Sequence, residues 1–132
     1  MDYFHVTLSE REVASHSILA LAHLGDSVYE LMVRTRLLIN ADLTNRTMHN
    51  ETLNYVNASA QFEAYQKIKD ILTPFEADIF RRGRNARVKT VPRNADRAKY
   101  HTATGVEALF GALWLSGNHE RLNQLFEIIV DP

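Results

Sequence analysis

The feature that most constrains the fold is the helical spacing of apolar residues along nearly the whole chain. It is clearest in the run LALAHLGDSVYELMVRTRLL, from Leu19 to Leu38. Leu21, Val28, Leu31 and Leu38 share the apolar side of this helix, which Ser15 or Ser17 can cap and which we expect to end near Asn40. Strand-like alternation is absent from the sequence. The pattern therefore predicts an all-α fold.

Capping signals indicate where the other helices begin and end. We expect a second helix from about Asn45 to Ile71 and a third whose start carries Thr73 as N-cap, a proline, and Glu76 to complete a capping box. Gly83 is predicted to end that third helix. Further helices are expected in TATGVEALFGALWLSG and, after Asn118 as N-cap, in HERLNQLFEIIV. About five to seven helices in 132 residues make a single domain.

Composition excludes several classes of site and location. The chain has no cysteine, which rules out a disulfide framework, a thiolate zinc site and a cysteine nucleophile. Its most apolar windows are short and are interrupted by His23, Asp26 and Glu30, and the first residues lack the basic and apolar regions of a signal peptide. We therefore expect a cytoplasmic protein without a membrane partner.

The charge is distributed unevenly, although the net charge is only −1. Residues 81–99, called the basic segment below, carry eight basic side chains and the single acid Asp96, a local balance of +7 that leaves −8 for the rest of the chain. A polyanion would be repelled by the acidic body and attracted to this segment. The ordinary alternative is that the segment is simply a solvated charged surface.

Two acids, Asp26 and Glu107, lie within helices on faces that are otherwise apolar. Gly25 and Gly111 lie close to them, and glycine inside a helix costs about 1 kcal/mol relative to alanine. These glycines would allow two helix backbones to approach closely. Two carboxylates brought together repel each other unless a hard cation lies between them, and oxygen ligands suit Mg²⁺ or Mn²⁺.

The alternative for each acid is a structural ion pair. An acid on an apolar helix face can be the partner of a nearby base, and Arg34, Arg36 or the basic segment could provide one for Asp26.

The sequence motifs around the two acids resemble those of a known family. LAHLGDSVYEL is similar to the signature helix of the ribonuclease III family, whose aspartate binds metal, and TGVEALFGALWL is similar to the family's second acidic helix. The resemblance extends from about Leu19 to Leu125. FRRGRNARVKTVPRN looks like the compact Mini-ribonuclease III subgroup, which lacks the C-terminal double-stranded-RNA-binding domain.

The resemblance implies a Mg²⁺-dependent endoribonuclease, with Mn²⁺ as a substitute, that cleaves double-stranded RNA and leaves 5′-phosphate ends. Residues 1–132 would form one ribonuclease III-like catalytic domain without the additional RNA-binding domain. Asp26 and Glu107 would be both the catalytic residues and the metal ligands. Two further acids of the family are replaced here by Ala22 and Thr104, which puts a full two-metal arrangement in doubt.

The partners that the resemblance implies are a second copy of the chain, as a homodimer, and double-stranded RNA, with precursor 23S ribosomal RNA as the substrate to be matured. It leaves a ribosomal protein open as a further partner. The side chains expected to bind RNA are Arg81, Arg82, Arg84, Asn85, Arg87, Lys89, Arg93 and Lys99.

Two rival interpretations remain. In the first, the chain is a noncatalytic ribonuclease III-like RNA-binding module in ribosome assembly, and Asp26 and Glu107 are structural partners. In the second, it is a helical protein-interaction domain, which leaves the basic segment unexplained.

Overall fold

A computed structural model describes residues 1–87, 91, 93 and 96–132. These residues form seven α-helices and one 3₁₀ turn, which confirms the predicted all-α fold. The elements are α1 (Glu10–Ala14), α2 (Ile18–Asn40), α3 (Asn45–Val56), α4 (Ala58–Ile68), η1 (Lys69–Ile71), α5 (Pro74–Asn85), α6 (Arg97–Leu115) and α7 (His119–Val130). None of the described helices is both long and apolar enough to cross a membrane.

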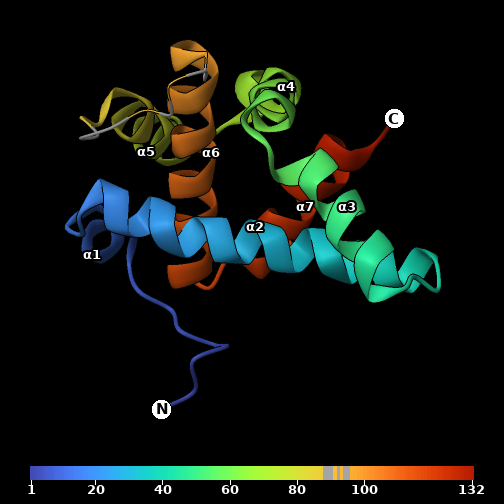
Figure 1. The fold of residues 1–132 in the computed structure, drawn as a ribbon. Coiled ribbons are helices and arrows are strands. Elements are labelled where there is room, and N and C mark those ends of the chain that lie inside the picture. Colours follow the sequence, from blue (N-terminus) through green and yellow to red (C-terminus); the bar gives the residue numbers. More distant parts are fainter. Residues whose placement is uncertain (88–90, 92, 94–95) are drawn as a thin grey trace.

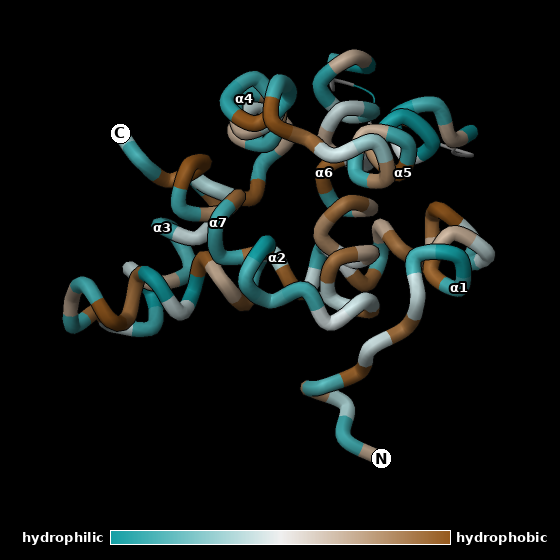
Figure 2. Tube along the Cα trace, turned by 180° about the vertical axis from the view of Figure 1, so that it is seen from behind, coloured by the Kyte–Doolittle hydropathy of each residue, from teal (hydrophilic) through white to brown (hydrophobic). Residues whose placement is uncertain are grey.

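Helix α6 is the centre of the fold. It stands upright in Figure 1 and α2 crosses it, and its main neighbours are α2, α5 and α4. From Thr102 to Leu113 every residue of α6 is buried except Glu107, which is half-buried. In Figure 2 the hydrophobic residues of α6 follow its middle turns, whereas its first turns are more hydrophilic. Glu107 is therefore a half-buried acid within the most buried helix of the fold.

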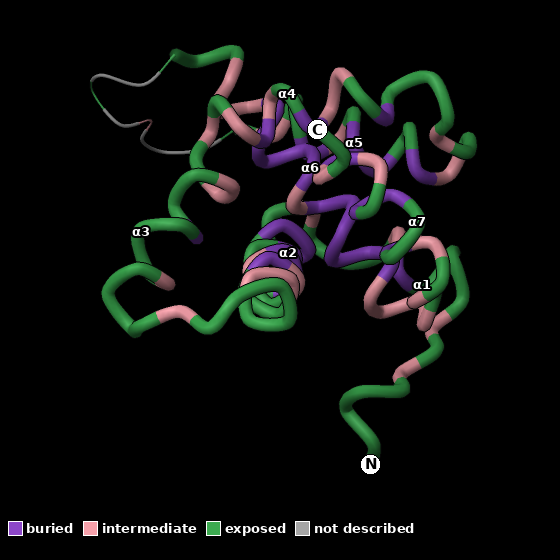
Figure 3. The backbone as a smooth tube through the Cα atoms, turned by 90° about the vertical axis from the view of Figure 1, so that its right-hand side faces the viewer, coloured by how far each residue is buried: buried purple, intermediate pink, exposed green. Residues whose placement is uncertain are grey.

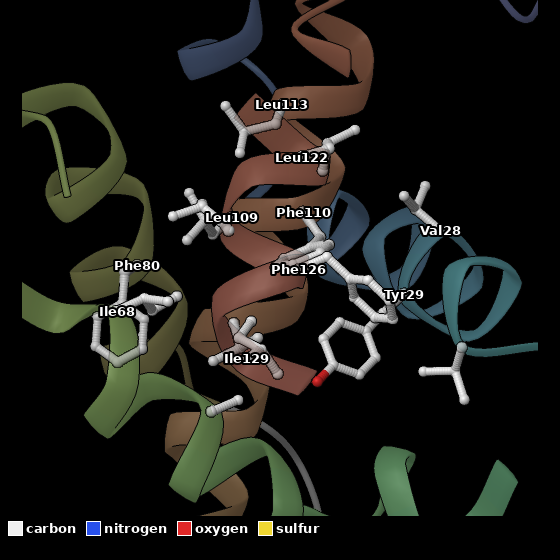
Figure 4. Close-up of a cluster of buried hydrophobic side chains, with 14 residues drawn as sticks. Val28, Tyr29, Ile68, Phe80, Leu109, Phe110, Leu113, Leu122, Phe126 and Ile129 are labelled. Atoms are coloured by element: carbon white, nitrogen blue, oxygen red, sulfur yellow. The ribbon is translucent and has the colours of Figure 1, made fainter. Parts of the chain in front are cut away.

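The main core lies where α2, α6 and α7 meet and extends to α4 and α5, and its buried segments are marked in Figure 3. Tyr29 of α2 packs edge-on against Phe110 of α6, with ring centroids 4.9 Å apart, and against Phe126 of α7 at 5.9 Å. Figure 4 shows these rings among aliphatic side chains from the same helices. This packing fixes α2 against α6 and so fixes the residues that the two helices present at their crossing.

The capping signals identified several helix ends correctly. The Ser17 hydroxyl accepts a hydrogen bond from the Ala20 N–H at 3.3 Å, and α2 ends at Asn40 as expected. Thr73 and Glu76 form the predicted capping box, with bonds of 2.9 and 3.2 Å. The Asn118 side chain caps α7. Each of these signals depends on residues only three positions apart, so local chemistry alone determines it.

The single second helix predicted over 45–71 is wrong. The chain leaves the helical conformation at Asn57, whose side chain instead accepts a hydrogen bond from the Ala60 N–H at 2.8 Å and caps α4. A short helix, α1, was also not predicted. It begins with a capping box between Ser9 and Glu12, a signal that the sequence contained.

Gly83 does not end α5, which continues to Asn85. Its role is close packing, because a Cβ atom there would lie 2.9 Å from the Gly105 Cα and 3.0 Å from the Ala108 Cβ of α6. Helix α6 also starts earlier than expected, at Arg97. The Asp96 side chain caps it by accepting a hydrogen bond from the Lys99 N–H at 3.2 Å. The end of the basic segment is therefore helical.

Candidate active site

The crossing of α2 and α6 depends on two glycines. A Cβ atom on Gly25 would lie 1.6 Å from the Glu107 carbonyl oxygen, and one on Gly111 would lie 2.0 Å from the Leu21 carbonyl oxygen. Both distances are far below van der Waals contact, so no larger residue fits while the helices keep this separation. The predicted close approach of the two backbones is confirmed.

The crossing places Asp26 of α2 and Glu107 of α6 beside the same surface depression, which has a volume of about 350 Å³. Its other lining residues are Leu19, Ala22, His23, Tyr100 and Thr104. The structure thus brings the two predicted acids together. The expectation that Asp26 lies on a buried face is wrong, since Asp26 is exposed and Glu107 is the acid that is half-buried.

The two carboxyl groups interact strongly. The pKa of Glu107 is raised from 4.5 to about 8, chiefly by burial and then by its hydrogen bond with, and repulsion by, the Asp26 carboxyl group. No ion pair in the described residues joins either acid to a basic side chain, and Arg34, a candidate partner, pairs with Glu30 at 3.2 Å instead. The two carboxyl groups therefore have no positively charged partner among the described residues, and a bound cation would supply that charge.

A hard divalent cation fits this pair of carboxylates, although the protein would supply few of its ligands. Within the described ranges no group of three or more His, Cys, Asp or Glu side chains could hold a metal ion. The Ala22 side chain has no atom that can bind a metal. The Thr104 hydroxyl donates a hydrogen bond to the Tyr100 carbonyl oxygen at 3.1 Å. Mg²⁺ commonly keeps several waters and binds proteins through one or two carboxylates. Asp26 and Glu107 would therefore be the ligands of such an ion.

The raised pKa of Glu107 predicts how pH affects metal-free protein. Between about pH 4.5 and 8 the folded state keeps a proton that the unfolded chain releases, so the free energy of unfolding falls as pH rises. Glu107→Gln removes this contribution. In EDTA, urea unfolding at pH 5 and at pH 8 should therefore show a larger loss of stability for the wild type than for the variant. Equal losses of stability in the wild type and the variant would contradict a raised pKa of Glu107.

Three of the predicted RNA-binding side chains contact other parts of the protein. Arg81 pairs with Asp78. Arg82 donates to the Ala14 carbonyl oxygen at 3.2 Å, and Lys99 donates to the Ser59 hydroxyl at 3.3 Å. The Arg81–Asp78 pair is an i,i+3 contact that the sequence could have indicated. The partners of Arg82 and Lys99 lie on distant helices, so the sequence alone could not indicate them.

The other predicted RNA-binding residues have different positions. Arg84, Asn85 and Arg87 line a second hollow, of about 390 Å³, together with Arg97 and His101. Arg93 is exposed, and Lys89 lies outside the described residues.

Sequence reasoning missed some of the residues around the two hollows. Tyr100 is one of these, whereas Thr104 is already named as the position where the sequence replaces an acid of the family. The two precede Glu107 by seven and three positions on α6, a spacing that places them on one helix face. His23 lines the same depression from α2. Asp96 is the signal that locates Tyr100, because a helix capped at Asp96 carries Tyr100 and Glu107 on the same face.

Comparison with known proteins gives consistent matches. The model of the Ribonuclease III domain matches residues 19–118. Among curated proteins, Mini-ribonuclease 3 of Thermoanaerobacter is 42% identical, covering 93% of this chain and 87% of that protein. Mini-ribonuclease 3 of Gloeobacter violaceus is 44% identical, covering 89% and 84%. A crystal structure of a Fusobacterium nucleatum protein superposes with a TM-score of 0.82 at 31% identity, covering 90% of this chain and 95% of that one.

Proposed function

This chain belongs to the ribonuclease III family, in its Mini-ribonuclease 3 group, and on that premise we propose that it is a Mg²⁺-dependent endonuclease of double-stranded RNA with Asp26 and Glu107 as its catalytic pair. The observation that carries the proposal is the meeting of these two acids in one depression without a basic partner among the described residues. Mn²⁺ offers the same preference for oxygen ligands and is the expected substitute.

The two acids have a defined task in this reaction. A bound divalent cation would supply the charge that activates water and stabilises the phosphate in the transition state. Asp26 and Glu107 would hold that charge at the α2–α6 crossing, where the glycines fix the backbone of Glu107. Water adds its oxygen to phosphorus, the bond from phosphorus to the 3′ oxygen breaks, and that oxygen takes a proton. The products carry 5′-phosphate and 3′-hydroxyl ends.

The basic segment is the proposed contact with RNA. A-form duplexes are bound mainly through phosphates and 2′-hydroxyls, which require bases and amides rather than side chains that read base edges. Arg84, Asn85 and Arg87 line one hollow at this end of the molecule and Arg93 is exposed. The acidic remainder of the chain offers no comparable attraction for a polyanion.

The natural substrate and location are finer proposals that rest on the family alone. We propose precursor 23S ribosomal RNA as the substrate, cut near base-paired ends in the cytoplasm, with a ribosomal protein as an accessory partner. The rival proposal, a noncatalytic RNA-binding module in ribosome assembly, requires Asp26 and Glu107 to be structural partners of other groups. Their mutual repulsion favours the catalytic proposal.

The test of the proposed function is cleavage of a long RNA duplex. With Mg²⁺ the wild-type protein should convert the duplex to shorter products with 5′-phosphate ends, and EDTA should stop the reaction. A single-stranded RNA of the same length and base composition is the matched control and should be cut far more slowly. Tight duplex binding without Mg²⁺-dependent cleavage would instead establish the noncatalytic module.

We also propose that the active form is a homodimer. Leu31 and Leu38, expected on the buried side of α2, are 52% and 57% exposed, and the neighbouring Ile39 is 77% exposed. Large apolar side chains gathered along one helix leave a surface that a second copy could cover. One pair of carboxylates can serve one strand, so two copies would be needed to cut both strands in one binding event.

Subunit mixing distinguishes a dimer from a monomer. When wild-type protein is refolded with excess Asp26→Asn protein, heterodimers with one working site should nick the duplex, so the ratio of nicks to double-strand breaks should rise with the proportion of variant. Native and denaturing gels of one labelled duplex at early times give this ratio. A ratio that stays constant after confirmed subunit exchange would contradict the two-site dimer.

A further inference from the structure

Tyr100 of α6 lines the depression that holds Asp26 and Glu107, but the proposed reaction gives it no task. It precedes Glu107 by seven residues on one continuous helix, which corresponds to about two turns, or about 10 Å along the axis. Side chains of an α-helix lean toward its N-terminus, so the side chain of Glu107 leans toward the turns that carry Thr104 and Tyr100. Tyr100 is therefore placed to contact a nucleotide next to the phosphate that the two acids address.

The contacts that Tyr100 makes within the described chain use its backbone and its ring. Its N–H donates to the Asp96 carbonyl oxygen at 2.9 Å, and its carbonyl oxygen accepts from the Thr104 hydroxyl at 3.1 Å. Its half-buried ring lies edge-on to that of His101, with centroids 5.9 Å apart. A phenolic hydroxyl can both donate and accept a hydrogen bond, and these contacts leave both capacities of Tyr100 for a ligand.

The surroundings of Tyr100 favour a neutral ligand over a phosphate. The described lining of the depression contains no arginine or lysine, and two of its residues are the acids themselves. Apart from His23, its other side chains are uncharged, namely Leu19, Ala22 and Thr104. A sugar hydroxyl is neutral and matches the donor and acceptor capacity of a phenol. The apolar side chains beside it suit the carbon atoms of a ribose.

We propose that Tyr100 is a specificity-determining residue, whose hydroxyl bonds the ribose 2′-hydroxyl of a nucleotide next to the phosphate that is cut. The inference rests on the proposed function and names the feature of the substrate that this side of the site recognises. The 2′-hydroxyl is the group that distinguishes RNA from DNA. Basic side chains attract both kinds of nucleic acid, because both carry phosphates. Tyr100 adds the selection of RNA beside the reacting bond.

The experiment combines a protein that lacks the phenolic hydroxyl with RNA duplexes that lack one 2′-hydroxyl. Tyr100→Phe removes only the phenolic oxygen, and Tyr3→Phe is the matched control at a position that is 76% exposed and precedes α1. The parent duplex has one mapped cut in a labelled strand, and each modified duplex carries 2′-deoxyribose at a single nucleotide near that cut. Thermal unfolding establishes that each variant is folded. Single-turnover rates with Mg²⁺ over a range of protein concentrations give the cleavage efficiency.

For the wild type, one of the deoxy substitutions should lower the cleavage efficiency about fivefold, as expected for the loss of one hydrogen bond between neutral groups. Tyr100→Phe should cut the parent duplex about fivefold less efficiently, and the same deoxy substitution should then cause no further loss, because the bond is already absent. Tyr3→Phe should show the wild-type losses at every position. Coupling between one side chain and one sugar is a result that a structural role of Tyr100 would not produce.

Three results would overturn the inference and leave the proposed function intact. An equal slowing of every duplex by Tyr100→Phe would assign the hydroxyl to another group of the RNA, and wild-type rates in this variant would assign it no contact. A wild-type protein that is insensitive to every deoxy substitution would overturn the inference even if Tyr100→Phe failed to fold. A folded wild-type protein that cuts none of the duplexes would overturn the proposed function and the inference with it.

Discussion

Gly25→Ala is expected to lower the free energy of unfolding by more than about 3 kcal/mol, beyond the usual cost of an overpacked core, or to prevent folding altogether. The added methyl carbon would lie 1.6 Å from the Glu107 carbonyl oxygen and 2.7 Å from the Gly111 amide nitrogen. Both atoms belong to the backbone of the most buried helix, so no side chain can rotate away to make room. The two helices would have to separate along their whole contact.

Urea unfolding measures this effect, and Ser27→Ala is the matched control. Ser27 is two residues away on the same helix and is exposed, so its replacement should change stability by no more than about 0.5 kcal/mol, as for most surface substitutions. A Gly25→Ala protein with the stability of the control would show that the helices do not cross as closely as described.

The sequence was most informative where chemistry is local or where a residue is out of place. Thr73 with Glu76, and Asn118, identified helix ends because a cap and its partner are three residues apart. Asp26 and Glu107 were identifiable because acids are rare on apolar helix faces, and the adjacent glycines then indicated that the helices meet there. The two acids line the depression, and the two glycines allow the helix crossing that brings the acids together.

Sequence reasoning was less successful where tertiary contacts decide the outcome. Gly83 has the residue type of a helix end, but α6 lies so close to it that only glycine fits in the middle of the contact. Asn57 has a helical sequence on both sides, yet its side chain caps the following helix instead of continuing the first. The Gly83 contact depends on residues distant in the sequence, so periodicity could not reveal it. The Asn57 cap is a local signal, three residues from its partner, which the helical pattern on both sides obscured.

The same limit applies to the charges. Eight bases close together in sequence appear equivalent as a list, yet the structure engages Arg82 with the Ala14 carbonyl oxygen and Lys99 with Ser59, while Arg84 and Arg97 line a hollow. Ser59 is forty residues from Lys99 in the chain. The partners of Arg82 and Lys99 thus lie on α1 and α4, which are distant in the sequence, and only the tertiary packing brings them together.

Asp26→Asn is the substitution with the largest expected effect on activity. It removes one negative charge from the exposed acid of the pair and barely changes its volume, so folding should be preserved. Relief of the repulsion on Glu107 should even stabilise the metal-free protein at neutral pH. A metal ion supplies several kcal/mol of transition-state stabilisation in such reactions, so loss of a ligand should slow cleavage by about 1000-fold or more. Glu107→Gln should behave in the same way.

The most direct measurement is the single-turnover rate of cleavage of one RNA duplex by wild-type, Asp26→Asn and Glu30→Gln proteins at saturating protein and Mg²⁺. Glu30 is the matched control because it is an acid one turn further along α2 whose partner is Arg34, outside the depression. We expect Glu30→Gln to cut within a few-fold of the wild-type rate, and Asp26→Asn to bind the duplex with near-wild-type affinity but to leave it uncut. Cleavage by Asp26→Asn at a near-wild-type rate would contradict the assignment of this carboxylate pair as the catalytic centre.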